Sequence, residues 1–153
     1  MALPNIFEYN TCEQICQRIT KLTVNIKPLW GKMSAAQMLA HCNVTYEYVY
    51  EPDKYKPATG FMKLILMWFI KKQVVSEKPY KKSSPTGPDF KIITDKNFEE
   101  EQSRLISFLH KAQVQGAKHF EGKMSHSFGR LTASEWNNMF YKHIDHHLRQ
   151  FGV

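Results

Sequence analysis

The chain has 153 residues and a formal net charge of +7, with 42% apolar and 23% charged residues. A chain of this length can build one hydrophobic core without disulfides, so we expect a single domain over residues 1–153. The positive charge is concentrated in the middle of the chain, which predicts a solvated surface with a basic loop. Because no helix-turn-helix, RNP or zinc-finger pattern accompanies the lysines, nucleic acid is not an expected partner.

The first ten residues, MALPNIFEYN, contain no basic segment followed by an apolar one, so no secretory signal is predicted. The longest apolar run, residues 61–70, is interrupted by Lys63 and is much shorter than the ~20 residues of a membrane span. Three cysteines without a signal are typical of a reducing compartment. The sequence therefore predicts a soluble cytoplasmic protein with no membrane partner.

Three helices are predicted from one start pattern, a Ser or Thr followed three residues later by Glu or Gln. In this capping box the hydroxyl accepts a hydrogen bond from a free backbone N–H, and the longer side chain accepts one from the cap residue's own N–H. In chain order the pairs are Thr11 with Gln14, Ser34 with Gln37, and Thr132 with Glu135.

The middle of the chain predicts a long crossover between helices. A short apolar helix is expected over about residues 61–72, and residues 76–95, rich in proline, predict a loop with a brief extended stretch at 91–94. A long helix should begin after Asp95, with Gly116 as its C-cap. Four amphipathic helices with one long crossover predict an all-α bundle, with no sheet beyond a short strand pair in the crossover or loops.

The short crossover helix carries the large apolar residues Leu64, Trp68 and Phe69. Either this helix packs on the core, or its apolar face exceeds what a small bundle covers and pairs two copies by two-fold symmetry. The prediction is a homodimer that pairs through this face.

The last thirteen residues, YKHIDHHLRQFGV, hold three histidines in five positions. At about 100° per residue, Asp145 and Leu148 fall on the far side of the predicted helix, and His146 lies on its flank. His143 and His147 share one face, which continues the apolar stripe of Trp136, Met139 and Phe140. This pair is therefore predicted to face the core.

His41 also lies on the inward face of its predicted helix. One inward histidine is usually a hydrogen-bonded core residue, but three that converge need partners for many nitrogens. A metal satisfies several at once, and an i, i+4 pair directs two nitrogens to one point. The spacing thus indicates His41, His143 and His147 as ligands of one divalent ion, zinc or nickel by imidazole's preference.

Three stretches, KMSAAQMLAHC, GRLTASEW and YKHIDHHLRQFG, resemble the DinB-like superfamily, specifically an uncharacterised branch of small bacterial proteins. The resemblance covers about residues 29–153. It implies a four-helix bundle, with a short extra helix in the crossover, that holds a divalent metal through His41, His143 and His147. Gln150 stands in the family's trailing Arg/Gln pattern. The extra His146 is a departure, and it leaves a His143/His146 pair as the alternative.

The resemblance also implies a reaction, because members are similar to thiol-dependent S-transferases that use bacillithiol or mycothiol. The expected partners are then a small-molecule thiol and an electrophile. A metal-dependent hydrolase and a non-catalytic metal-binding or stress-response module are the alternatives. Tyr48 and Gln37, on the His41 stripe, are the candidate acid/base groups, and His126 lies in a loop that could roof the site.

The cysteines offer competing sites. Cys12 and Cys16 are spaced i, i+4 and could ligate zinc, but no second Cys or His pair accompanies them in the same segment, which favours small core residues. Cys42 points about 100° away from His41, a poor direction for the same metal. His110 is expected at the surface.

Overall fold

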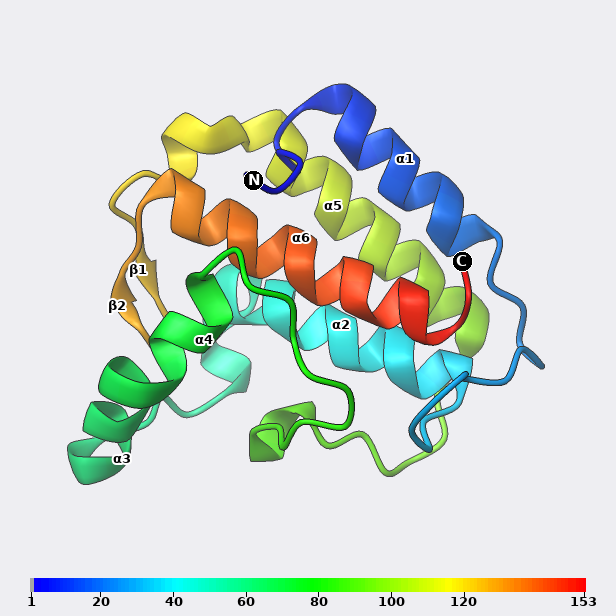
Figure 1. Ribbon diagram of the computed structural model, residues 1–153, viewed down its shortest axis with the longest axis horizontal. Helices are drawn as coiled ribbons and strands as arrows, with labels where there is room; N and C mark the ends of the chain where they lie inside the picture. The colour runs from blue at the N-terminus through cyan, green and yellow to red at the C-terminus, as the bar shows by residue number, and fades with distance from the viewer. Residues whose placement is uncertain (1) are drawn as a thin grey trace.

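In a computed structural model, which describes residues 2–153, the chain is mostly helical (Figure 1). Within these residues, β1 (Met124–Ser125) and β2 (Gly129–Arg130) form a two-stranded antiparallel hairpin, which is the only sheet there. A π-helical turn, Leu66–Ile70, joins α3 to α4, and 3-10 turns lie at Pro52–Lys54 and Pro88–Phe90. The helices are α1 (Tyr9–Thr20), α2 (Ala35–Tyr50), α3 (Gly60–Ile65), α4 (Lys71–Val75), α5 (Phe98–Phe120) and α6 (Ala133–Gln150).

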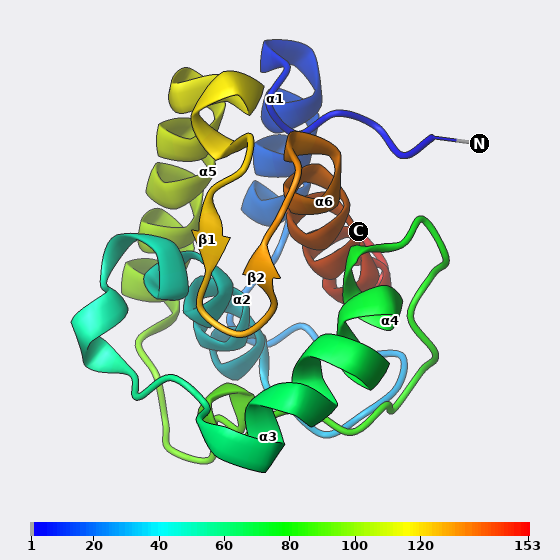
Figure 2. The ribbon, with the colours of Figure 1, turned by 90° about the vertical axis from the view of Figure 1, so that its left-hand side faces the viewer.

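The four long helices, α1, α2, α5 and α6, lie side by side and enclose the core (Figures 1 and 2). Helix α6 contacts each of the other three, so its side chains meet neighbours on several sides. Phe140 of α6 stacks on Tyr46 of α2 with ring centroids 4.8 Å apart, and it meets Phe120 of α5 edge-on at 5.4 Å. Aromatic contacts therefore join α2, α5 and α6 at the centre of the molecule.

Two of the three predicted capping boxes form. Ser34 and Gln37 exchange both hydrogen bonds at the start of α2, and Thr132 and Glu135 do so at the start of α6. The prediction for Thr11 is wrong, because α1 already begins at Tyr9 and Thr11 lies inside its first turn.

The start of α1 is set by tertiary contacts rather than by a side-chain cap. Glu8 occupies the N-cap position without a capping hydrogen bond. The preceding residues Ile6 and Phe7 are buried in the core, and the backbone N–H of Ile6 donates to Asn137 Oδ1 at 2.7 Å. These contacts fix where the chain enters the helix.

The prediction of Gly116 as a helix end is confirmed in its conformation. Gly116 leaves the helical conformation, with φ of 70°, so that α5 consists of two helical segments that meet at a kink there. The second segment runs on to Phe120, which is fully buried against the aromatic core. At the other end Asn97 caps α5, two residues beyond Asp95, by accepting from the N–H of Glu100.

The crossover leaves the four long helices through α3 and returns along α4, which packs on α6 (Figure 2). The side chain of Lys142 donates to the carbonyls of Gln73 (2.8 Å) and Ser76 (2.5 Å), and Asn138 Nδ2 donates to that of Val75 (2.9 Å). Two side chains of α6 therefore satisfy carbonyls at the end of α4 that the helix itself leaves free.

Three of the large apolar residues of the crossover helix face outward. Leu64, Trp68 and Phe69 are 52%, 75% and 72% exposed, so they do not pack on the core. Pairing of two copies through this face stays a prediction.

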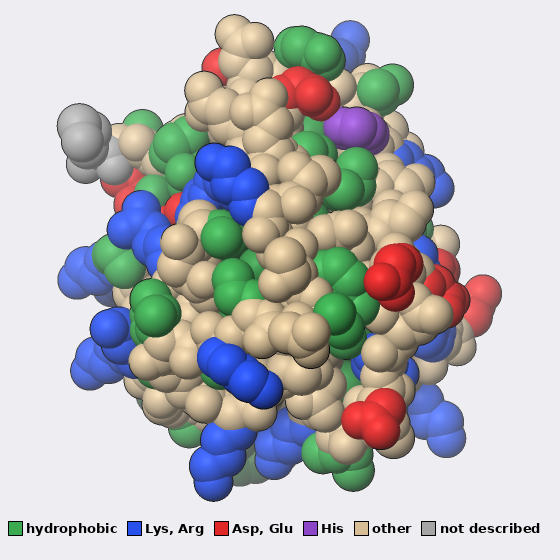
Figure 3. Space-filling model, turned by 90° about the vertical axis from the view of Figure 1, so that its right-hand side faces the viewer, with side chains coloured by type: hydrophobic (Ala, Val, Ile, Leu, Met, Phe, Trp, Pro, Cys, Tyr) green, Lys and Arg blue, Asp and Glu red, His purple; other side chains and the backbone are tan. Residues whose placement is uncertain are grey.

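Charge is unevenly spread over the surface. On the face in Figure 3, lysine and arginine side chains gather along the left and lower edges, and acidic side chains gather mainly on the right. Within residues 2–153, none of the helices combines the length and the apolar character that crossing a bilayer demands.

The two threonines at predicted caps, Thr11 and Thr132, give a matched test of helix capping. Thr132→Ala removes the acceptor for the N–H of Glu135 and should lower the free energy of unfolding by about 1 kcal/mol. Thr11→Ala removes no cap and should cost clearly less. Urea denaturation followed by circular dichroism measures both, and equal losses would contradict the observed start of α1.

Candidate metal centre

Helices α2 and α6 bring the three predicted histidines together. One ring nitrogen from each of His41, His143 and His147 can be chosen so that the three atoms lie within 4.8 Å of one another. His41 Nε2 is 3.0 Å from His143 Nε2, and the His147 ring centroid lies 4.5 Å from that of His41. The i, i+4 spacing on α6 and one inward position on α2 thus converge, as the sequence predicts.

Two of the histidines have their tautomer fixed by a carbonyl oxygen. His41 Nδ1 lies 2.8 Å from the backbone oxygen of Phe90, and His147 Nδ1 lies 2.8 Å from Gln150 Oε1. Since these oxygens only accept hydrogen bonds, both Nδ1 atoms carry the proton. The Gln150 amide cannot turn round freely, because its Nε2 donates to the carbonyl of Trp30 at 2.7 Å. Both Nε2 atoms therefore present a lone pair.

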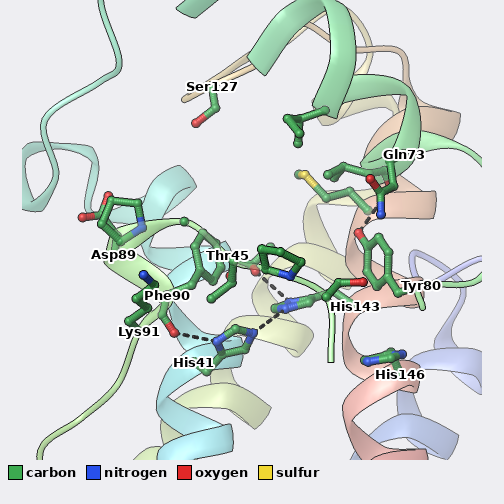
Figure 4. Close-up of a pocket in the computed structure, with 18 of the residues that line it drawn as sticks. His41, Thr45, Gln73, Tyr80, Asp89, Phe90, Lys91, Ser127, His143 and His146 are labelled. Carbon is green, nitrogen blue, oxygen red and sulfur yellow. Dashed lines mark hydrogen bonds between the residues drawn. The ribbon is translucent and has the colours of Figure 1, made fainter. Parts of the chain in front are cut away.

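His143 differs from the other two histidines, because the hydrogen-bond partner of its Nδ1 can either donate or accept. Its Nδ1 lies 2.9 Å from Thr45 Oγ1, as Figure 4 shows, and a hydroxyl can donate or accept. Without an ion, His143 Nε2–H donates to the His41 Nε2 lone pair. If His143 instead donates from Nδ1 to Thr45, all three Nε2 lone pairs become free for one ion. Outer partners on the second nitrogen are how metal-bound histidines are oriented, so these residues fit a divalent metal.

Burial keeps the three imidazoles neutral. It is the main cause that lowers the pKa of His147 to about 3 and the pKa of His143 well below its ordinary value; neighbouring histidines lower both further. Burial also lowers the pKa of His41, although the hydrogen bond to Phe90 partly opposes this. A neutral imidazole is the form that ligates a metal.

A cavity of about 1040 Å³ reaches the three histidines. His41 and His147 are buried, whereas His143 is half-buried and lines the cavity. The walls of this cavity come from α2, the segment before it, α6, the crossover and the hairpin. They combine large apolar side chains with cationic ones, among them Met33, Leu66, Ile70, Phe128, Lys32, Lys56, Lys81 and Lys91.

The end of α6 is clamped by the segment that precedes α2. Besides the Gln150–Trp30 hydrogen bond, the N–H of Leu29 donates to the Gln150 backbone carbonyl at 2.7 Å. Gly31 has φ of +83°, and a Cβ there would lie 2.6 Å from Gln150 Nε2. A glycine at this position therefore leaves the room that Gln150 needs to orient His147.

The two predicted acid/base groups lie differently. Tyr48 lines the cavity and donates to Asp89 at 2.7 Å, and burial together with Asp89 raises its pKa. His126 lines the cavity too, stacked on Tyr48 with centroids 4.0 Å apart. Gln37 does not line it: its side chain serves the capping box and donates to the Thr94 carbonyl.

His146 lies outside the converging group. Its ring meets those of Trp30 and Tyr80 edge-on, with centroids 5.8 Å and 5.7 Å away, and Figure 4 shows it apart from the other labelled histidines. The expected far side of α6 is not a free face. Leu148 is fully buried, and Asp145 pairs with Arg18 of α1 at 2.8 Å. The reason is that α6 is central and packs on both sides.

Sequence reasoning missed the partners that orient the ring nitrogens. Gln150, three residues after His147, could have been found by helix geometry. The Phe90 carbonyl could not, because every residue has a carbonyl. Cys42 takes no part: its thiol is buried and donates to Met38 Sδ at 3.7 Å, and burial raises its pKa.

The hydrogen-bond pattern predicts tautomers. In metal-free protein, nitrogen-15 NMR of the imidazoles should show the proton of His41 and His147 on Nδ1, since the Phe90 and Gln150 oxygens cannot donate. Gln150→Leu removes this constraint from His147 alone and should leave His41 unchanged. A proton on Nε2 of His147 in the parent protein would refute the arrangement.

Comparisons with known proteins identify the family to which the chain belongs. No curated protein and no solved structure matches it significantly. One family model matches residues 2–152, nearly the whole length. The chain therefore belongs to the family described as "Protein of unknown function (DUF1569)".

Proposed function

We propose that this protein is a metal-dependent enzyme with a DinB-like four-helix bundle, in which His41, His143 and His147 hold one zinc or nickel ion. The observation that carries the proposal is the hydrogen bonding of the three rings. Each Nδ1 has a partner outside the group, and the Nε2 atoms are left to converge. The packing of α1, α2, α5 and α6 and the resemblance of the histidine segments support the superfamily.

The site suits catalysis better than a purely structural role. Three protein ligands leave a coordination position open, and a bound divalent ion supplies a Lewis acid that lowers the pKa of a coordinated thiol or water. The cavity reaches His143, whereas a structural ion would be sealed from solvent. Phe90, Thr45 and Gln150 would orient the ligands.

The reaction we propose is S-transfer from a small-molecule thiol. The sulfur forms a bond to an electrophilic carbon, the leaving group departs with its bonding electron pair, and the thiol proton passes to solvent. The apolar walls suit the electrophile. Lysines on the cavity, such as Lys32, Lys81 and Lys91, suit the carboxylates that low-molecular-weight thiols carry.

Hydrolysis is the alternative, because water could take the place of the thiol. Tyr48, hydrogen-bonded to Asp89 and stacked on His126, places polar groups on the same cavity. A hydrolase would use them on a carbonyl substrate. The two reactions share the metal site and differ in the nucleophile.

The ligand assignment is tested by metal binding. His143→Ala and His147→Ala should each abolish tight zinc or nickel binding, because either change leaves two ligands. Gln150→Leu, which only frees the His147 ring, should weaken binding about 10- to 100-fold. His146→Ala is the matched control and should change affinity little. Competition with a chelating dye measures all four, and strong loss from His146→Ala with little from His147→Ala would reverse the assignment.

The reaction is tested by thiol consumption. Metal-loaded protein, given bacillithiol, mycothiol or glutathione with an alkylating electrophile, should consume thiol in a chelator-sensitive manner. The rate should rise with pH through a pKa well below the ~8.5 of a free thiol. His143→Ala should lose turnover while its circular dichroism stays unchanged, and His146→Ala should retain it. If the metal-loaded protein consumes no thiol but cleaves esters, the proposed S-transfer is wrong and hydrolysis takes its place.

A further inference from the structure

A second group of metal-ligating side chains lies between α1 and α5. Cys12 and Cys16 of α1 and His110 of α5 each offer a ligand atom, and these atoms lie within 4.8 Å of one another. None of the three lines the cavity of the histidine centre. This group was not expected from the sequence, because His110 is 94 residues away from Cys16 along the chain.

The distance between Cys16 and His110 matches that of a tetrahedral zinc site. Cys16 Sγ lies 3.6 Å from His110 Nε2. With Zn–S of about 2.3 Å and Zn–N of about 2.0 Å, a tetrahedron places sulfur and nitrogen about 3.5 Å apart. Glu13 Oε1 lies 2.9 Å from the same nitrogen, in a hydrogen bond that zinc binding would replace.

We propose that Cys12, Cys16 and His110 bind one zinc ion, as a site that fastens α1 to α5. Two sulfurs and one nitrogen are ligands that zinc accepts, and water on the half-exposed His110 side would complete the tetrahedron. On binding, each thiol forms a bond to the ion and releases its proton to solvent, so two protons leave for each zinc bound. The proposal does not depend on the histidine centre.

The burial of the group suits an ion that enters from one side. Cys12 and Cys16 are buried, so their sulfurs are held by the packing of α1. The side chains of His110 and Glu13 are 48% and 33% exposed. Zinc can therefore approach the sulfurs from the side of His110 and Glu13, which faces solvent.

Cobalt(II) distinguishes this site from the three histidines, because only thiolate ligands give a sulfur-to-cobalt charge-transfer band in the near ultraviolet. The experiment uses the full chain with His143→Ala and His147→Ala, which disable the other centre. One equivalent of cobalt should produce the band, and zinc should displace it. Cys16→Ser should remove the band, and Cys42→Ser, the matched control, should retain it.

A second variant covers the case in which a cysteine change disturbs folding. His110→Gln alters an exposed side chain, so the fold should persist by circular dichroism while cobalt affinity falls at least tenfold. Zinc should raise the thermal midpoint of the chain that carries His143→Ala and His147→Ala, and should leave that midpoint nearly unchanged when His110→Gln is added. Absence of the cobalt band from the chain with the two histidine changes alone would overturn the site. A band that survives both Cys16→Ser and His110→Gln would also overturn it.

Discussion

A buried imidazole needs a partner for each nitrogen, and this requirement organises one end of the molecule. The partner of His41 Nδ1 is the carbonyl of Phe90, which requires the crossover to return over α2 after it has passed through α3. His147 takes the Gln150 amide, whose own N–H groups need the Trp30 carbonyl, so the segment before α2 must lie on the end of α6. The routes of two irregular segments follow from satisfying two rings.

Other buried polar groups extend the same principle to the walls of the cavity. Lys142 enters the core and donates to carbonyls at the end of α4, and burial lowers its pKa to about 8. Glu47 is buried between Arg104 (2.6 Å) and Lys54 (2.6 Å), with Tyr55 also donating to it. These bonds tie α4 to α6, and the end of α2 to α5 and to the turn that follows it. Because breaking a buried pair leaves a charge without a partner, such ties hold the cavity walls in one arrangement.

How far the sequence predicts this structure depends on whether a feature is local. The caps at Ser34 and Thr132 and the stripe of His143 and His147 depend on helix geometry, so spacing alone found them. Gly116 breaks the regular helix as its local pattern predicts, but the second helical segment that follows it ends at the buried Phe120. The start of α1 goes with the burial of Ile6 and Phe7, which the local pattern does not encode.

The same distinction applies to the two groups of ligands. The i, i+4 spacing on α6 predicts the histidine pair, and the inward position of His41 on α2 predicts the third member. The Phe90 carbonyl and the approach of His110 to the cysteines are long-range contacts, and no spacing within one segment encodes them. Only the packing of α1 on α5 reveals that Cys12 and Cys16 have a third possible ligand.

The chemistry of the two groups differs in a way that suits different roles. Three neutral imidazoles would leave the charge of a divalent ion acting on what the cavity admits. Two thiolates would neutralise that charge, which suits an ion that only holds helices together. The roles connect through Arg18 of α1, which donates to Asp145 at 2.8 Å and to the Val153 carbonyl at 2.9 Å. Since Gln150 lies between these two contacts, an ion that fastens α1 to α5 would also steady the end of α6 that orients His147.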